Sequence, residues 1–146
     1  MMICNDEYFM REALKEAQKA FDRDEVPVGA VVVADERIIA RGHNLTELLN
    51  DVTAHAEMQA VTAAFQALGG KFLTDCTLYI TLEPCPMCAG ALFWARPERV
   101  VFGANDPKNG FLKHKPNLLH PKTLLTTGVL ADDAAALLKA FFEKKR

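Results

Sequence analysis

His55-Ala56-Glu57, followed later in the chain by Pro84-Cys85-Pro86-Met87-Cys88, contains three good zinc ligands and one carboxylate that zinc does not need. Structural zinc sites usually close with four protein ligands, whereas catalytic sites keep one position open for water. Zinc lowers the pKa of a water in that position to about 7. One imidazole, two thiolates and a free carboxylate therefore predict a catalytic site, with one Zn²⁺ held by His55, Cys85 and Cys88.

The two cysteines are three positions apart, so on one turn of a helix they share a face. Pro84 suits the first position of such a helix, because its missing N–H would have no partner there. Both thiols then lie in the first turn, where free N–H groups and the positive end of the helix dipole favour the thiolate. Zinc binds the thiolate form, so this placement supports a metal site.

His55 opens a second expected helix, over residues 54–68, which Asp51 or Thr53 can cap. Glu57 lies two positions after His55 and therefore points to a different face of that helix. From there it does not easily join His55 on the metal, but it can reach a water beside it. We expect Glu57 to be the catalytic residue that accepts a proton from this water and passes it on.

Two other interpretations of the cysteine pair remain open. A lone Cys-x-x-Cys is also typical of a redox pair or of half a structural zinc site. A redox pair would leave His55 and Glu57 without a role. A structural zinc site needs a fourth protein ligand, for which the sequence offers Cys4, His43, Cys76, His114 and His120.

The composition indicates one domain over residues 1–146, large enough for an ordinary hydrophobic core. No apolar stretch approaches the ~18 residues of a membrane span, and no signal-peptide pattern is present. We therefore expect a cytoplasmic protein without membrane association. Four cysteines, two of them assigned to a metal, agree with a reducing compartment.

The net charge of −2 argues against a generic nucleic-acid binder, but the charge is unevenly distributed. Residues 108–122 carry lysines and neither Asp nor Glu. Such a segment is either a phosphate-binding loop or an ordinary solvated loop.

Hydrophobic periodicity predicts strands that alternate with helices after an initial hairpin. The expected helices cover residues 6–23, 54–68, 84–94 and the segment from 132 onward, and the expected strands cover 26–33, 37–41, 77–82, 98–102 and 123–127. This order predicts an α/β fold, a three-layer α/β/α sandwich around a mixed five-stranded sheet. Two of its helices would bring their N-termini, and with them both halves of the zinc site, to one place.

The metal residues match the signature H-x-E…P-C-x-x-C of the zinc-dependent nucleoside and nucleobase deaminases. Within that family, the sequence most resembles the tRNA adenosine deaminases, and the resemblance extends over the entire chain. It is carried by Glu25–Ala30, Thr53–Glu57, Thr81–Cys85, Val101–Ala104 and Gly128–Asp132. Pro86 and residues 93–97 instead resemble the guanine deaminases of the same superfamily, and the loop 108–121 differs from the commoner tRNA-enzyme pattern.

The resemblance implies a cytidine deaminase-like fold and hydrolytic deamination of adenosine to inosine at the wobble position of a tRNA anticodon. It also implies a homodimer that binds the tRNA anticodon loop with both subunits. By the same resemblance Asn44 contacts the target base, and Val28 and Pro27 line its pocket. From geometry, not from the resemblance, we expect the backbone N–H groups of Ala56 and Cys88 to orient the base or the intermediate. The alternative interpretations are that Asn44 is an ordinary turn residue after the strand over residues 37–41 and that Val28 is an ordinary core residue.

Two alternatives to this activity are kept. The first is a guanine or cytosine deaminase of the same superfamily that acts on free bases or nucleosides. The second is a catalytically silent RNA-binding module stabilised by zinc, for which Glu57 would be unnecessary.

Overall fold

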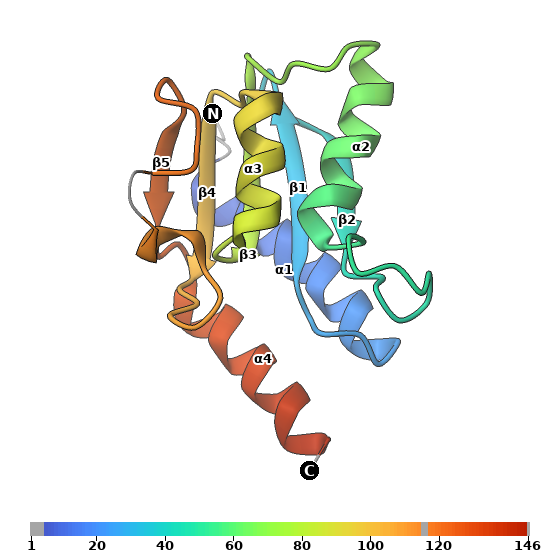
Figure 1. The fold of residues 1–146 in the computed structure, drawn as a ribbon. Coiled ribbons are helices and arrows are strands. Elements are labelled where there is room, and N and C mark those ends of the chain that lie inside the picture. The colour runs from blue at the N-terminus through green and yellow to red at the C-terminus, as the bar shows by residue number, and fades with distance from the viewer. Residues whose placement is uncertain (1–4, 115–116, 146) are drawn as a thin grey trace.

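The computed structural model describes residues 5–114 and 117–145. Its five strands form one mixed sheet in the order β2-β1-β3-β4-β5, with α2 and α3 on one face and α1 and α4 on the other (Figure 1). The strands are β1 Gly29–Ala34, β2 Arg37–His43, β3 Cys76–Leu82, β4 Arg99–Ala104 and β5 Leu124–Thr127; the helices are α1 Asp6–Asp22, α2 Ala56–Leu68, α3 Pro86–Ala95 and α4 Ala131–Lys144, with a 3₁₀ turn at Phe111–Lys113. The predicted three-layer α/β/α sandwich is confirmed.

Strand direction brings the functional segments to one edge of the sheet. β3, β4 and β5 run parallel, whereas β1 runs antiparallel to both β2 and β3. The carboxyl end of β3 leads directly into α3, and α2 begins at the same edge (Figure 1). In open α/β sheets this edge, beyond the carboxyl ends of the parallel strands, is where ligands bind.

The helix starts differ in part from the sequence prediction. Asn5 caps α1, because its Oδ1 accepts the Tyr8 N–H at 2.9 Å. α2 is capped neither by Asp51 nor by Thr53; its N-cap is His55. The Asp51 carboxylate instead accepts the N–H and hydroxyl of Thr53 within its own turn.

The cysteine helix also starts later than predicted. Cys85 is the N-cap of α3 and Pro86 occupies its first turn, so Pro84 lies before the helix. Pro86 fits there for the reason given above for Pro84, since the first turn needs no N–H from it.

The first strand begins at Gly29 rather than at Val26. The Val28 N–H bonds the Val26 carbonyl at 2.9 Å, so the backbone around Pro27 turns before it joins the sheet. The predicted initial hairpin is confirmed, and its turn residues Asp35 and Glu36 both have positive φ (52° and 59°), the geometry of a tight hairpin.

Two glycines allow the helices to touch the sheet closely. A Cβ on Gly29 would lie 2.1 Å from the Ala13 carbonyl oxygen in α1, and one on Gly42 would lie 2.6 Å from the Ala60 nitrogen in α2. Helices therefore pack against the backbones of β1 and β2 from opposite sides.

The core consists of two layers, one on each face of the sheet. Val32, Ile80 and Phe102 pack toward α2 and α3, whereas Val31 and Val101 pack toward α1. Alternating strand residues thus serve the two faces. Within the described residues, no helix combines the length and apolar character required to cross a membrane.

Candidate active site

Three side chains at the sheet edge form a cluster of the predicted composition. The Nδ1 of His55 lies 3.7 Å from the Sγ of Cys85 and 3.4 Å from the Sγ of Cys88. Tetrahedral zinc with ordinary Zn–N and Zn–S bonds places a ligating nitrogen and sulfur about 3.6 Å apart. The three residues therefore fit a zinc ion without rearrangement.

The fold places each ligand at the start of a helix. His55 is the N-cap of α2 and Cys85 the N-cap of α3, while Cys88 lies in the first turn of α3. The positive ends of two helix dipoles thus meet at the cluster and favour thiolate over thiol.

The two sulfurs differ in their affinity for a proton. The hydrogen bond from the Cys88 thiol lowers the pKa of Cys85 to about 4, and the same bond to Cys85, together with burial, raises the pKa of Cys88. The hydrogen bond with Cys85 also raises the pKa of His55. The two sulfurs therefore share a proton, which a divalent cation would displace.

Glu57 lies beside the cluster without belonging to it. It is 3% exposed, it lies in the first turn of α2, and its carboxyl contacts the Cys88 thiol. Burial raises its pKa to about 7. Both protonation states are thus accessible near neutral pH, which a residue that accepts and returns a proton requires.

The cluster opens into a cavity of about 530 Å³. Of the predicted substrate contacts, Asn44, Val28 and the Ala56 backbone segment line it. Pro27 is buried but does not line the cavity, and its neighbour Val26 does. The Asn44 amide donates to the Val26 carbonyl at 3.3 Å and accepts the Thr46 N–H at 3.2 Å, so its orientation is fixed.

The structure also tests the proposed fourth ligand of a structural zinc site. Over residues 5–114 and 117–145, no further His, Cys, Asp or Glu joins the three-residue cluster. His43, Cys76, His114 and His120 are therefore not ligands, and Cys4 lies outside the described residues. An open fourth position agrees with a catalytic rather than a structural zinc site.

Several cavity residues escaped the sequence analysis. Glu83, Asp106 and Asn109 line the cavity, and Glu83 is a buried carboxylate. The available signal for Glu83 was its position directly before the Pro84–Cys88 segment. No periodicity pointed to Asp106 or Asn109, because they lie in an irregular loop after β4.

Comparison with known proteins agrees with this geometry. The family model for the cytidine and deoxycytidylate deaminase zinc-binding region matches residues 3–104. The chain belongs to this deaminase family. As a member it is a zinc-dependent hydrolytic deaminase, which agrees with the ligand set and with Glu57.

Individual relatives of the deaminase family are similar over most of the chain. A tRNA-specific adenosine deaminase of Bacillus subtilis (strain 168) is 49% identical, covering 97% of this chain and 91% of the relative. A structure from a study of A-to-I editing by tRNA:A34 deaminases aligns with a TM-score of 0.84 at 45% identity, covering 89% of this chain and 98% of that one. The structure of a guanine deaminase from Bacillus subtilis aligns with a TM-score of 0.67 at 44% identity, covering 70% of this chain and 66% of that one.

Proposed function

We propose that this deaminase converts adenosine to inosine at the wobble position of a tRNA anticodon, in the cytoplasm. The observation that carries the proposal is the joint occurrence of the His55, Cys85, Cys88 and Glu57 site with relatives described as tRNA-specific adenosine deaminases. Those from bacteria are 41–49% identical and cover at least 94% of this chain.

Glu57 carries the proton transfers in the proposed reaction. Zinc, when bound by His55, Cys85 and Cys88, supplies an acidified water. Glu57 accepts a proton from the water that adds to C6 of adenine and delivers a proton to N1. Glu57 next takes the proton of the hydroxyl now on C6 and gives it to the exocyclic amine, which leaves as ammonia, so that C6 keeps the oxygen as the carbonyl of inosine.

The cavity binds the target base in this proposal. Asn44 presents a fixed amide, Val28 and Val26 supply apolar contacts, and the Ala56 backbone orients the base; Pro27 is buried next to Val28 in the chain and does not line the cavity. A base reaches such a pocket only after leaving its stack, which costs least in a single-stranded loop. An anticodon loop meets that requirement.

The lysine-rich segment offers phosphate contacts near the cavity. Asn109 lines the cavity, and the exposed Lys108 and Lys113 flank it in sequence. Lys115 lies outside the described residues. Contacts of this kind supply sequence-independent affinity that falls as the salt concentration rises.

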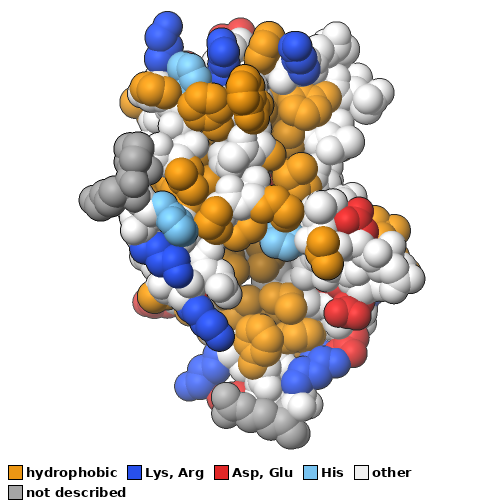
Figure 2. All heavy atoms as spheres, in the orientation of Figure 1, with side chains coloured by type: hydrophobic (Ala, Val, Ile, Leu, Met, Phe, Trp, Pro, Cys, Tyr) orange, Lys and Arg blue, Asp and Glu red, His pale blue; other side chains and the backbone are white. Residues whose placement is uncertain are grey.

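A homodimer is part of the proposal, with α3 as the interface. Leu92 belongs to the monomer core, but Phe93 is only partly buried and Trp94 is 70% exposed. From the sequence, the apolar residues of this helix, including Leu92 and Phe93, are either interface or monomer core. Figure 2 shows hydrophobic side chains gathered on this face of the molecule. An exposed apolar area of this kind is typical of an interaction surface.

The decisive experiment measures product base and ammonia after purified, zinc-loaded protein is incubated separately with an anticodon stem-loop, adenosine, guanine and cytosine. We expect inosine from the stem-loop and no turnover of free guanine. The similarity to guanine deaminase gives the alternative substrate a specific basis. Turnover of guanine without turnover of the stem-loop would replace our substrate assignment and leave the zinc chemistry in place.

A further inference from the structure

Two buried carboxylates near the cavity have no basic partner within the described residues. Glu25 is 1% exposed and Glu83 is 5% exposed. Neither forms an ion pair there, and neither belongs to the metal cluster. Most of the hydrogen bonds that satisfy these buried charges come from loop backbone N–H groups.

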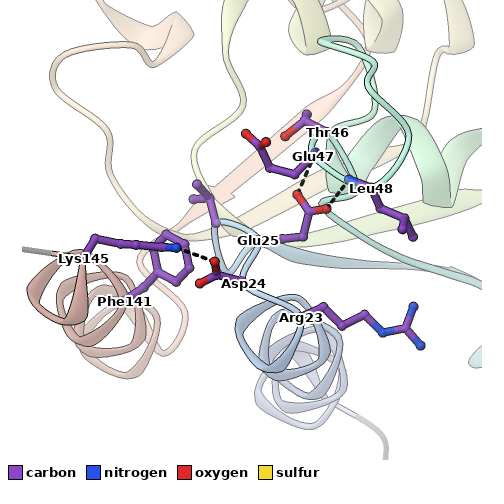
Figure 3. A pocket seen from close by; sticks show the side chains of 9 residues that line it. Arg23, Asp24, Glu25, Thr46, Glu47, Leu48, Phe141 and Lys145 are labelled. Carbon is purple, nitrogen blue, oxygen red and sulfur yellow. Dashed lines mark hydrogen bonds and ion pairs between the residues drawn. The ribbon is translucent and has the colours of Figure 1, made fainter.

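Glu25 holds the loop on one side of the cavity. Its Oε1 accepts the Glu47 N–H at 3.0 Å and its Oε2 accepts the Leu48 N–H at 2.7 Å (Figure 3). The same loop carries Asn44 and Thr46, which line the active-site cavity.

Packing alone does not hold this loop. A second cavity, of about 710 Å³, lies along it and is lined by Leu48, Phe141 and Lys145 among others (Figure 3). Thr46 lines both cavities, so the loop borders each of them at this point. The Glu25 carboxylate therefore fixes a segment with space on two sides.

Glu83 holds the loop on the other side in the same manner. Its Oε1 accepts the Asp106 N–H at 2.9 Å and the Asn105 side-chain amide at 3.3 Å, and its Oε2 accepts the Leu112 N–H at 2.9 Å. Gly110 packs so closely that a Cβ there would lie 2.0 Å from Oε2. This loop contributes Asp106 and Asn109 to the cavity.

A carboxylate suits this task better than an amide. Both of its oxygens accept, so each can satisfy an N–H without a choice of orientation. A glutamine would turn an NH₂ group toward one of those N–H groups and leave the loop donor without an acceptor in a buried place.

We propose that Glu25 and Glu83 are positioning residues that hold the two loop walls, residues 44–48 and 105–112, at the separation that admits the target nucleotide. This inference rests on the proposed RNA substrate. Glu25 and Glu83 act through the loops, and neither takes part in the proton transfers.

The test compares Glu25→Gln and Glu83→Gln with the wild type, using zinc-loaded protein and an anticodon stem-loop. We expect KM to rise about tenfold in each variant while kcat changes less than about threefold. Hydrogen exchange should accelerate in residues 46–48 of the first variant and in 105–112 of the second. The strands of the sheet should keep their protection in both.

Glu16→Gln is the matched control, because Glu16 is a 3% exposed carboxylate that pairs with Lys19 and Arg41 away from the cavity. It should lower stability without changing KM. An unchanged KM in both glutamine variants, an equal KM rise in Glu16→Gln, or a failure of both variants to fold would overturn the inference. If the wild type does not deaminate the stem-loop, the proposed function fails, and the exchange pattern alone decides whether the glutamates hold the walls.

Discussion

At the scale of single residues, the chemistry depends on Glu57 being close to the metal ligands without being one of them. It is buried in the first turn of α2, and burial raises its pKa to about 7. A carboxyl group with that pKa can give and take protons near neutral pH.

Replacing Glu57 with Gln should therefore lower kcat by about 10²- to 10⁴-fold, the usual contribution of a general acid–base group. The variant should bind the same amount of zinc and unfold at a similar temperature, since Gln has nearly the same shape. Steady-state kinetics, metal analysis and thermal unfolding check this together. A variant that keeps more than about a tenth of the wild-type kcat would show that another group carries the proton.

Metal removal should act on stability as well as on turnover. The His55 and Cys85 ligands start two different helices, so a bound ion joins α2 to α3. An ion that binds only the folded state stabilises it. We expect a chelator to abolish activity and lower the unfolding temperature, and added Zn²⁺ to restore both. An unfolding temperature that does not depend on zinc would contradict this role of the ion.

At the scale of elements, the contact of α1 with β1 requires a glycine at position 29. A Cβ there would lie 2.1 Å from the Ala13 carbonyl oxygen and 2.3 Å from the Ala17 nitrogen. Gly29→Ala should therefore destabilise the fold by about 3 kcal/mol or more, at the upper end for overpacking. Gly70→Ala, whose Cβ meets nothing within 4 Å, serves as the control and should change stability by less than about 0.5 kcal/mol. Urea unfolding measures both.

An ion pair attaches the start of α1 to the sheet and gives stability a dependence on pH. Arg99 donates to both carboxylate oxygens of Asp6, at 2.9 and 2.8 Å, and the Tyr79 hydroxyl donates at 2.7 Å. The hydrogen bonds from Arg99, with that from Tyr79, hold the pKa of Asp6 below its usual value.

A lowered folded-state pKa stabilises the protein above the unfolded-state value of about 3.9, and this stabilisation is lost as the pH falls through the folded-state pKa. Asp6→Asn should therefore be less stable than the wild type at pH 7, and the difference should shrink between about pH 5 and pH 3. Denaturant midpoints across that range test this. A difference that stays constant down to pH 3 would mean that the ion pair is not its cause.

The order and type of the elements could be predicted from sequence because periodicity and turn residues report local preferences. The exact residues at which each element begins and ends could not be predicted, because contacts made in the folded structure decide them. Asp51 looked like a helix cap, but it is bound to Thr53, and Val26 looked like strand, but its carbonyl closes a turn before Gly29.

The metal ligands could be predicted because each half of the site, His55–Glu57 and Pro84–Cys88, is a recognisable local motif, although the halves lie 30 positions apart. The roles of Glu25 and Glu83 could not, because their partners lie 22 to 29 positions away in irregular loops. Hydrophobic patterns carry no signal for a buried carboxylate whose bonds go to a distant backbone.

At the scale of the whole molecule, the uncovered face of α3 carries a prediction about assembly. Trp94, in α3, is 70% exposed. We expect the protein to sediment as a dimer and Trp94→Glu to sediment as a monomer, because a charge in an apolar interface loses its hydration without gaining a partner. Tyr8→Glu, at an exposed residue of α1 on the other face of the sheet, is the control and should remain dimeric. A wild type that sediments as a monomer at micromolar concentration would contradict the dimer.

The two ends of the described chain lie at different distances from the cavity. Asp6 is bonded to Arg99, the first residue of β4, whereas the cavity lies beyond the last residues of β3 and β4. Lys145 instead pairs with Asp24 and lines the second cavity, which shares Val26 and Thr46 with the active-site cavity. An affinity tag, dye or surface linker joined ahead of α1 would thus start at the end of the sheet away from the cavity, while the same attachment after α4 would start beside the second cavity.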